Sequence, residues 1–279
     1  MLLLLLLFWV LLLCVLLLIW RRGGHSLDPL TSLHFHYPPL LPYQGHGNGY
    51  VPLMIHQTLS KREVPTLLWE RLLQPHRKTA PHFSFSFYDD DEMEAVIRQH
   101  FPPRVLTAYH RIHPAYGACR SDFGRYCILY VYGGLYLDIK SEIRKDPLSW
   151  LPSKNPVLLG GHWKHAAYHA ELLNHPKGEV MNWVLASTPH HPLLWELIMD
   201  ITQRIETGPN GRGKQFVLEL TGPIALSRIA LGKMDISDKI HEYFKYNSER
   251  CGWTDCKTVY YQGKKSYDQL VDEVLLSTP

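Results

Sequence analysis

Apolar and polar positions follow two different periods between residues 51 and 100. VPLMIHQT (51–58) is a short apolar run, which predicts a buried strand, and TLLWERLLQ (66–74) has the period of a helix. Apolar and polar residues alternate over 83–87, as in a strand, and the three aspartates at 89–91 are placed to cap a helix that runs to about His100. Strand, helix, strand and helix in this order predict a layered α/β domain.

The pattern of apolar residues further along predicts the centre of the domain. Residues 117–132 are apolar nearly all round, which indicates a buried helix. Two glycines at 133–134 can end this helix with left-handed backbone, and LYLDI (135–139) then predicts the central strand. A further strand is predicted at 155–162, and an amphipathic helix from about Pro192.

The N-terminus has a different character. MLLLLLLFWVLLLCVLLLIW (1–20) contains no charge, and twenty helical residues span about 30 Å, the thickness of a bilayer core. No basic region precedes it and no Ala-x-Ala site follows it, so we expect a retained transmembrane anchor. Residues 21–50 are rich in Gly, Pro and His and read as a stalk, which leaves 51–279 as the globular domain. We expect a single-pass protein of the Golgi or another secretory-pathway membrane, with its orientation open.

Composition narrows the class of protein. The 279 residues are 46% hydrophobic, enough for one sizeable core, and the net charge is only +3. Lys and Arg are scattered, with no basic stripe, so nucleic acid is not an expected partner. There is no Gly-x-Ser-x-Gly elbow for a hydrolase. Cys251 and Cys256 are close enough in sequence to form a disulfide, which stays open.

Charged groups stand out around the predicted central strand. Asp122 and Arg125 are three residues apart, so they share one face of an otherwise apolar helix. A buried charge costs several kcal/mol unless it is paired, so the two form either a structural ion pair or a pair that also grips a polar ligand. Strand alternation would place four polar side chains on one side, either around a ligand or at a solvent-exposed strand end: Tyr136, Asp138, Lys140 and Glu142.

RSDFGRYCILYVYGGLYLDIK (120–140) resembles the signature of glycosyltransferase family 32, which reads Arg-x-Asp-x-x-Arg-Tyr, a hydrophobic helix and Tyr-Gly-Gly-x-Tyr-x-Asp-x-Asp. Other segments are similar to the family in the family's order. They are VPLMIHQT, FPPRVLTAYHRIH, MNWVLASTPHHPLLWELI and LTGPIAL, so the resemblance runs from Val51 to Leu226.

The resemblance implies a GT-A nucleotide-diphospho-sugar transferase fold, an α/β sandwich around a mixed sheet, and a retaining transfer that uses Mn²⁺ or Mg²⁺. Asp122 and Arg125 would then contact the donor, Tyr136 would pack beside its nucleotide or diphosphate, and Asp138 would bind metal or ribose. Ile55, His56 and Gln57 are expected beside the base of the donor. Asn182 and Ser187 are expected near its sugar, and Thr221 and Gly222 near its phosphates.

The sequence departs from the family pattern at Lys140, which stands where the last aspartate would hold the metal. Asp138 and the diphosphate can still hold a cation, Glu142 can replace the lost ligand, or Lys140 can itself neutralise the diphosphate. We therefore expect Asp122, Arg125, Asp138 and Lys140 in catalysis, and Asp138 with Glu142 at a metal.

The functional expectation is a membrane-anchored transferase that moves a hexose from a nucleotide-sugar to a glycan or glycolipid acceptor, including a sphingolipid. Mannose from GDP-mannose is favoured. The alternatives are another sugar (glucose, galactose or N-acetylglucosamine) or an inactive, anchored protein that binds nucleotide-sugars or glycans, which Lys140 motivates.

Overall fold

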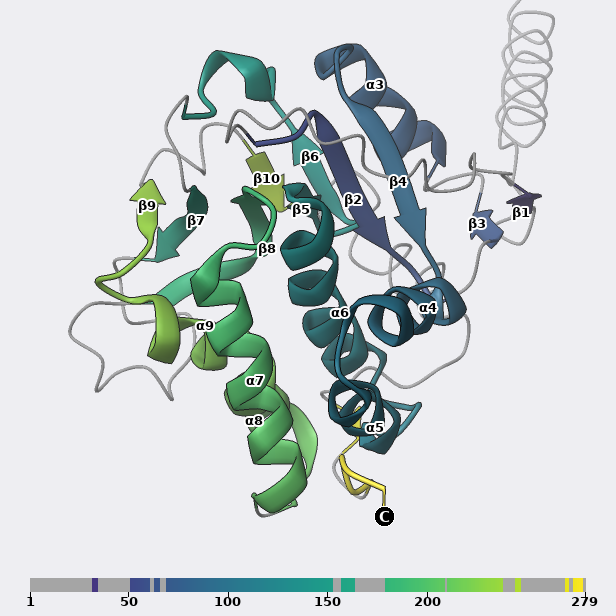
Figure 1. Cartoon of the computed structure of the whole chain (residues 1–279). Coiled ribbons are helices and arrows are strands. Elements are labelled where there is room, and N and C mark those ends of the chain that lie inside the picture. Colours follow the sequence, from purple (N-terminus) through teal and green to yellow (C-terminus); the bar gives the residue numbers. More distant parts are fainter. Residues whose placement is uncertain are drawn as a thin grey trace, which may run out of the picture.

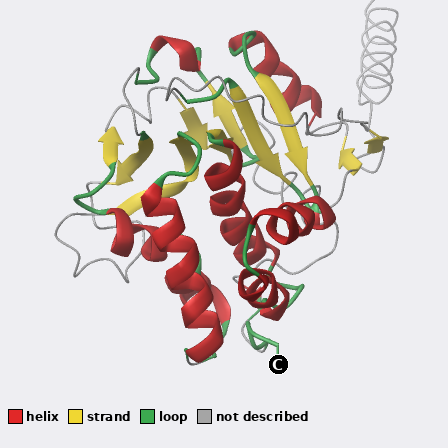
Figure 2. Ribbon diagram, viewed as in Figure 1, coloured by secondary structure: helices red, strands yellow, loops and turns green. Residues whose placement is uncertain are grey.

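The computed structural model describes residues 32–34, 51–60, 63–65, 69–152, 157–163, 179–208, 210–237, 244–246, 269–270 and 273–277. Its centre is a six-stranded mixed sheet in the order β4-β2-β5-β8-β7-β9 (Figures 1 and 2). The strands are β2 (Met54–Thr58), β4 (Ser84–Tyr88), β5 (Gly134–Leu137), β7 (Leu158–Trp163), β8 (Glu179–Ser187) and β9 (Asp235–Ser237). The expected α/β domain with a mixed sheet is confirmed.

Strand direction divides the sheet. Strand β2 runs parallel to both β4 and β5, and β7 runs parallel to β9. Strand β8 is antiparallel to β5 and β7 on its two sides. Two further pairs are antiparallel: β1 (Ser32–His34) with β3 (Glu63–Pro65), and β6 (Ser141–Ile143) with β10 (Phe244–Tyr246).

Helices cover the sheet and form most of the larger core. A cluster around α4, α5, α6 and α7 packs on the face that carries Tyr136 and Leu185, and these helices lie together below the sheet in Figure 1. A second core on the other face includes Ile55, Leu135 and Leu137. The helices are η1 (Trp69–Leu73, a π-helix), α3 (Gln74–Thr79), α4 (Asp90–His100), α5 (Pro103–Arg111), α6 (Gly117–Tyr132), η2 (Pro147–Ser149, a 3-10 helix), α7 (Pro192–Thr207), α8 (Gly213–Leu220) and α9 (Pro223–Ala230).

Two predicted helices are confirmed with their boundaries. Asp89 caps α4 by accepting a hydrogen bond from the Glu92 N–H at 2.9 Å, and its own N–H donates to the Glu92 side chain at 3.1 Å. Helix α6 covers the whole predicted range and is buried on nearly every side. Helix α5 is not among the predicted elements.

The turn after α6 requires its two glycines. Gly133 and Gly134 have φ values of 62° and 90°, which side chains rarely tolerate. A Cβ at Gly134 would also lie 2.7 Å from the Met54 carbonyl oxygen and 3.0 Å from Nε2 of His56. The missing side chains therefore allow α6 to pass directly into β5 in close contact with β2.

The prediction that the central strand runs through Ile139 is wrong. Strand β5 ends at Leu137, and the Asp138 N–H donates to the Trp183 carbonyl at 2.9 Å as the last bond to β8. The chain then turns, and the Ser141 N–H donates to the Asp138 carbonyl at 2.9 Å. Asp138, Lys140 and Glu142 consequently do not share one side of a continuous strand.

The expected membrane anchor at 1–20 and most of the expected stalk at 21–50 lie outside the described residues, as do Cys251 and Cys256. Among the helices in the described ranges, none combines the length and apolar character that crossing a bilayer requires.

Candidate functional site

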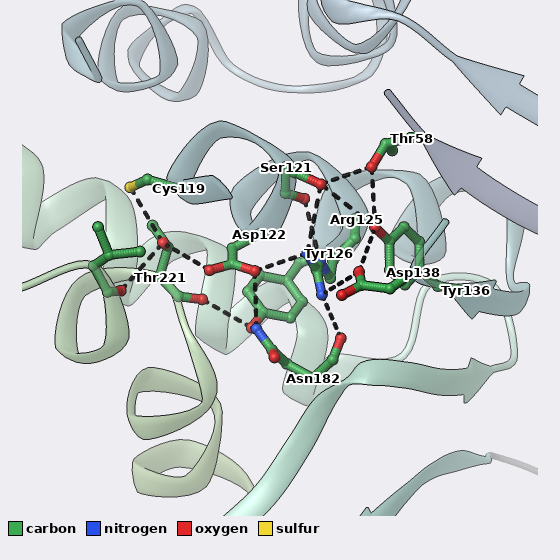
Figure 3. A network of polar contacts seen from close by, with 11 residues as sticks. Thr58, Cys119, Ser121, Asp122, Arg125, Tyr126, Tyr136, Asp138, Asn182 and Thr221 are labelled. Atoms are coloured by element: carbon green, nitrogen blue, oxygen red, sulfur yellow. Dashed lines mark hydrogen bonds and ion pairs between the residues drawn. The ribbon is translucent and has the colours of Figure 1, made fainter. Parts of the chain in front are cut away.

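The candidate site lies where two parallel strands end. Thr58 is the last residue of β2, and Asp138 follows directly after β5. Carboxyl ends of parallel strands meet at one edge of a sheet, the usual position of ligand sites in α/β folds. Helix α6 brings Asp122 and Arg125 to this edge, as Figure 3 shows.

An ion pair forms the base of the site. Nη2 of Arg125 is 2.8 Å from Oδ1 of Asp122, one helical turn away. Both side chains are almost removed from solvent, with 5% and 10% of their surfaces exposed, respectively. The predicted pairing is confirmed, and each charge offsets the cost of burying the other.

Arg125 also connects the helix to two strands. Its Nη1 lies 3.1 Å from Oδ1 of Asp138 and donates to the Asn182 carbonyl at 2.6 Å. The guanidinium carbon is 4.5 Å from the centre of the Tyr136 ring, a cation–π distance. Burial alone would lower the pKa of Arg125, but Asp138, Tyr136 and Asp122 raise it above its ordinary value, so the group stays charged.

Asp122 is held by neutral donors on its other side. Asn182 donates from Nδ2 to Oδ1 at 3.0 Å, and the Thr221 hydroxyl lies 3.4 Å from Oδ2. Burial raises the pKa of Asp122 to about 7; Arg125 opposes this shift and Asp138 adds to it. Because the Thr221 contact at Oδ2 is long, this oxygen can still accept a stronger hydrogen bond, for example from a ligand hydroxyl.

Asp138 is the member of the site that faces outward. Its side chain is 24% exposed, more than those of Asp122 and Arg125. Oδ1 forms the ion pair with Arg125 and accepts a hydrogen bond from the Tyr136 hydroxyl at 3.0 Å. Among the residues that the structure describes, Oδ2 has no partner.

A divalent cation fits this arrangement only if the protein supplies few of its ligands and the substrate supplies the others. No group of three or more His, Cys, Asp or Glu side chains in the described part of the chain could hold a metal ion. Mg²⁺ and similar cations are commonly held by one or two carboxylates together with substrate phosphates, and Oδ2 of Asp138 offers one such ligand. Glu142, on β6 beyond the turn, stays a prediction as a second ligand, and so does the role of Lys140.

The first-strand residues point elsewhere. Ile55 is fully buried in the opposite core. His56 is fully buried as well: its Nε2 donates to the Gly133 carbonyl at 2.9 Å and its Nδ1 accepts from the Tyr88 hydroxyl at 3.0 Å. Burial lowers the pKa of His56 to about 4, although the Gly133 carbonyl favours the charged ring. His56 therefore supports the glycine turn, and in the described part of the chain no contact joins Ile55 or His56 to Asp122, Arg125 or Asp138. Gln57 is also buried, and its Nε2 has no partner among the described residues.

Two other predicted positions also lie apart from the network. The Ser187 hydroxyl donates to the carbonyl of Thr188 at 2.8 Å and is fully buried. Gly222 precedes α9 in extended conformation, and only its neighbour Thr221 reaches the site. Asn182 and Tyr136, by contrast, join the network, and their expected contacts with the donor stay predictions.

Two hydroxyl groups of the site, those of Thr58 and Ser121, were not predicted from the sequence. The Thr58 hydroxyl lies 2.6 Å from that of Ser121 and 3.0 Å from that of Tyr136. Arg125 donates to the Ser121 hydroxyl at 3.4 Å. The signal available in the sequence was position: Thr58 ends the predicted strand, and Ser121 is one turn before Arg125 on the same helix.

Comparison with known proteins supports the predicted resemblance. Residues 68–156, which contain α6, β5 and the turn after it, match the family model described as "Glycosyltransferase sugar-binding region containing DXD motif". The chain reads Asp138-Ile139-Lys140 where that motif is expected.

Curated relatives agree with this match. The initiation-specific alpha-1,6-mannosyltransferase of Schizosaccharomyces pombe is 25% identical over 193 residues, 58% of this chain and 46% of that protein. Inositol phosphoceramide mannosyltransferase 2 of the same organism is 28% identical over 185 residues, 65% of this chain and 46% of that protein. The chain spans about half the length of these relatives. A solved structure, the PaToxG glycosyltransferase, aligns with a TM-score of 0.48 and 15% identity over 64% of this chain and 69% of that chain.

Proposed function

We propose that this chain, whose residues 68–156 match the sugar-binding region of a glycosyltransferase family, transfers a hexose from a nucleotide-diphospho-sugar to a glycan or glycolipid acceptor. The observation that carries the proposal is the buried Asp122–Arg125 pair joined to the outward-facing Asp138 at the carboxyl ends of parallel strands. Mannose, from GDP-mannose, is the favoured sugar because the relatives described above are named as mannosyltransferases.

The charges of the site suit a sugar better than a bare phosphate. Two carboxylates surround one guanidinium, and carboxylates accept hydrogen bonds from sugar hydroxyls. We propose that Asp122 and Asp138 each accept hydroxyl groups of the donor and that Arg125 keeps both oriented. Transfer breaks the bond between the anomeric carbon and the diphosphate, forms a bond to the acceptor oxygen, and releases the acceptor proton to the departing diphosphate.

The diphosphate requires positive charge as it leaves. We propose that a bound Mn²⁺ or Mg²⁺ would be held by Oδ2 of Asp138 together with the donor phosphates, and would supply Lewis-acid stabilisation of the leaving group. Lys140, in the turn two residues after Asp138, adds a charge at the same edge of the sheet. The hydrophobic segment at 1–20 is proposed to anchor the enzyme in a secretory-pathway membrane.

A donor panel tests the proposal. Full-length protein is incubated with GDP-mannose, UDP-glucose, UDP-galactose or UDP-N-acetylglucosamine, each with a mannose-containing glycan or inositol phosphoceramide. Mn²⁺, Mg²⁺ or excess EDTA is added in parallel. We expect transfer from GDP-mannose, and we expect Asp138→Asn to lower kcat/KM at least tenfold because one carboxylate charge is lost from the donor site.

The matched control is Asp146→Asn, which changes a half-buried aspartate whose side chain caps a short helix. It should transfer at the wild-type rate. Binding of a donor without turnover of any would instead support the inactive binding protein, and full turnover in EDTA would remove the cation from the proposal. Neither binding nor turnover of any donor would contradict the proposed function itself.

A further inference from the structure

A closed ring of four hydrogen bonds and one ion pair supports Asp138 from behind. Starting at the guanidinium, Nη2 of Arg125 donates to the Ser121 hydroxyl at 3.4 Å, and that hydroxyl is 2.6 Å from Thr58. Thr58 is 3.0 Å from the Tyr136 hydroxyl, which donates to Oδ1 of Asp138 at 3.0 Å. The 3.1 Å contact between Asp138 and Arg125 closes the ring, as the dashed lines in Figure 3 show.

Arg125 at one end of this series of hydrogen bonds and Asp138 at the other fix the direction of each bond between them. A guanidinium can only donate, an ionised carboxylate can only accept, and a hydroxyl has a single proton to give. The Tyr136 proton goes to Asp138, so its oxygen accepts, with Thr58 at 3.0 Å as the nearer donor and Ser121 at 3.4 Å as the farther one. The Thr58 oxygen must in turn accept from Ser121, whose oxygen accepts from Arg125. Burial raises the pKa of Tyr136 well above its ordinary value, so its proton is retained at neutral pH.

The four hydrogen bonds that lead from Arg125 through Ser121, Thr58 and Tyr136 to Asp138 all point the same way. Such a relay is cooperative, because each bond polarises the next in a low-dielectric interior. Thr58 and Tyr136 are nearly fully buried, at 3% and 1% exposure, so water does not readily replace a missing member. The ring commits Oδ1 of Asp138 to the protein, which leaves Oδ2 facing outward.

We propose that Thr58 and Ser121 are positioning residues, which act through Tyr136 to hold the Asp138 carboxylate with Oδ2 toward the donor. This inference rests on the proposed function for the identity of the ligand, although the ring itself does not depend on it. Neither hydroxyl needs to touch the donor for this role.

Replacing Thr58 tests the inference, since Thr58→Val keeps the shape and removes the hydroxyl, whereas Thr58→Ser keeps the hydroxyl. We expect Thr58→Val to raise the donor KM about tenfold with kcat within about threefold, because the carboxylate that binds the donor is no longer held. Thr58→Ser should restore the KM to within about twofold of wild type.

The matched control is Thr202→Val, at a buried threonine of α7 whose hydroxyl donates to the Ile198 carbonyl at 2.8 Å, away from the ring. Its donor KM should equal that of wild type. A general loss of folded protein would lower apparent kcat and leave KM unchanged, so the two causes separate. A Thr58→Val enzyme with the KM of the Thr202→Val enzyme would overturn the inference and leave the proposed function intact.

A second readout does not depend on activity. Thr58→Val and Tyr136→Phe break the same ring. In the Thr58→Val background, Tyr136→Phe should therefore lower the urea unfolding midpoint by less than half of the amount by which it lowers the midpoint of the wild-type protein. Full additivity would overturn the ring. If the wild-type protein neither bound nor turned over any donor, the proposed function would fail. The coupling between the two substitutions would still show whether the ring exists.

Discussion

Replacing Arg125 by methionine should destabilise the protein by about 3–5 kcal/mol, because it leaves a buried charge without its partner. The guanidinium is 5% exposed and contacts Asp122, Asp138 and the Asn182 carbonyl, and methionine can make none of these contacts. Urea unfolding measures the loss. Transfer should fall at least a hundredfold under conditions in which the variant is still folded, since both donor-binding carboxylates lose their orientation.

Two further variants separate charge from packing. Arg125→Met combined with Asp122→Asn should recover part of the stability, because the stranded carboxylate becomes neutral. Arg104→Met, at an exposed arginine that pairs with Glu206 on the surface, should unfold close to wild type. The account of the buried pair would be wrong if the Arg125 and Arg104 variants were equally stable.

Acid should unfold the protein through two buried histidines. Burial lowers the pKa of both His56 and His76 to about 4; the Gly133 carbonyl opposes this at His56 and the Ser141 backbone opposes it at His76. The unfolded chain takes up these protons near pH 6.5, whereas the folded chain takes them up only near pH 4. The contribution of these two neutral rings to the free energy of unfolding is therefore fully present above pH 6.5. It is lost as the pH falls, by about 2 kcal/mol for each histidine between pH 7 and 5.

Unfolding free energies at pH 7.5 and pH 5 check this expectation. His56→Gln and His76→Gln should each reduce the difference between the two pH values, even though both variants start from lower stability. His82→Gln, at an exposed histidine, should leave the difference unchanged. If neither buried variant changed the pH dependence, the neutral state assigned to these rings would be refuted.

The sequence predicts α6 and α4 well because each carries a strong local signal. Helix α6 is a sixteen-residue apolar run closed by glycines that need positive φ, and α4 begins with a reciprocal cap between Asp89 and Glu92. The acid and base three residues apart on α6 likewise show their pairing in the sequence, since the partners share a helix face.

The end of β5 could not be found in this way. Burial keeps alternating through the turn: Ile139, Ser141 and Ile143 are buried, while the polar residues between them are half-buried. A periodic pattern therefore continues although the strand has stopped, and only the departure of β6 to pair with β10 reveals the break.

Contacts between residues that are far apart in the sequence could not be predicted either. Thr58 and Ser121 are 63 positions apart and meet because β2 and α6 reach the same edge of the sheet. His56 carries no sign in the sequence that it faces the glycine turn and not a ligand. Both outcomes are set by which face of β2 packs on α6, which periodicity alone does not tell.

A crystal soaked with GDP-mannose, or with the donor that the panel selects, tests the central claim most directly. We predict that the sugar lies at the carboxyl ends of β2 and β5, with its hydroxyls or the diphosphate within hydrogen-bonding or metal-bridged reach of Oδ2 of Asp138 and with Asp122 behind it. Clear density for the donor at a place remote from Asp122, Arg125 and Asp138 would contradict the account.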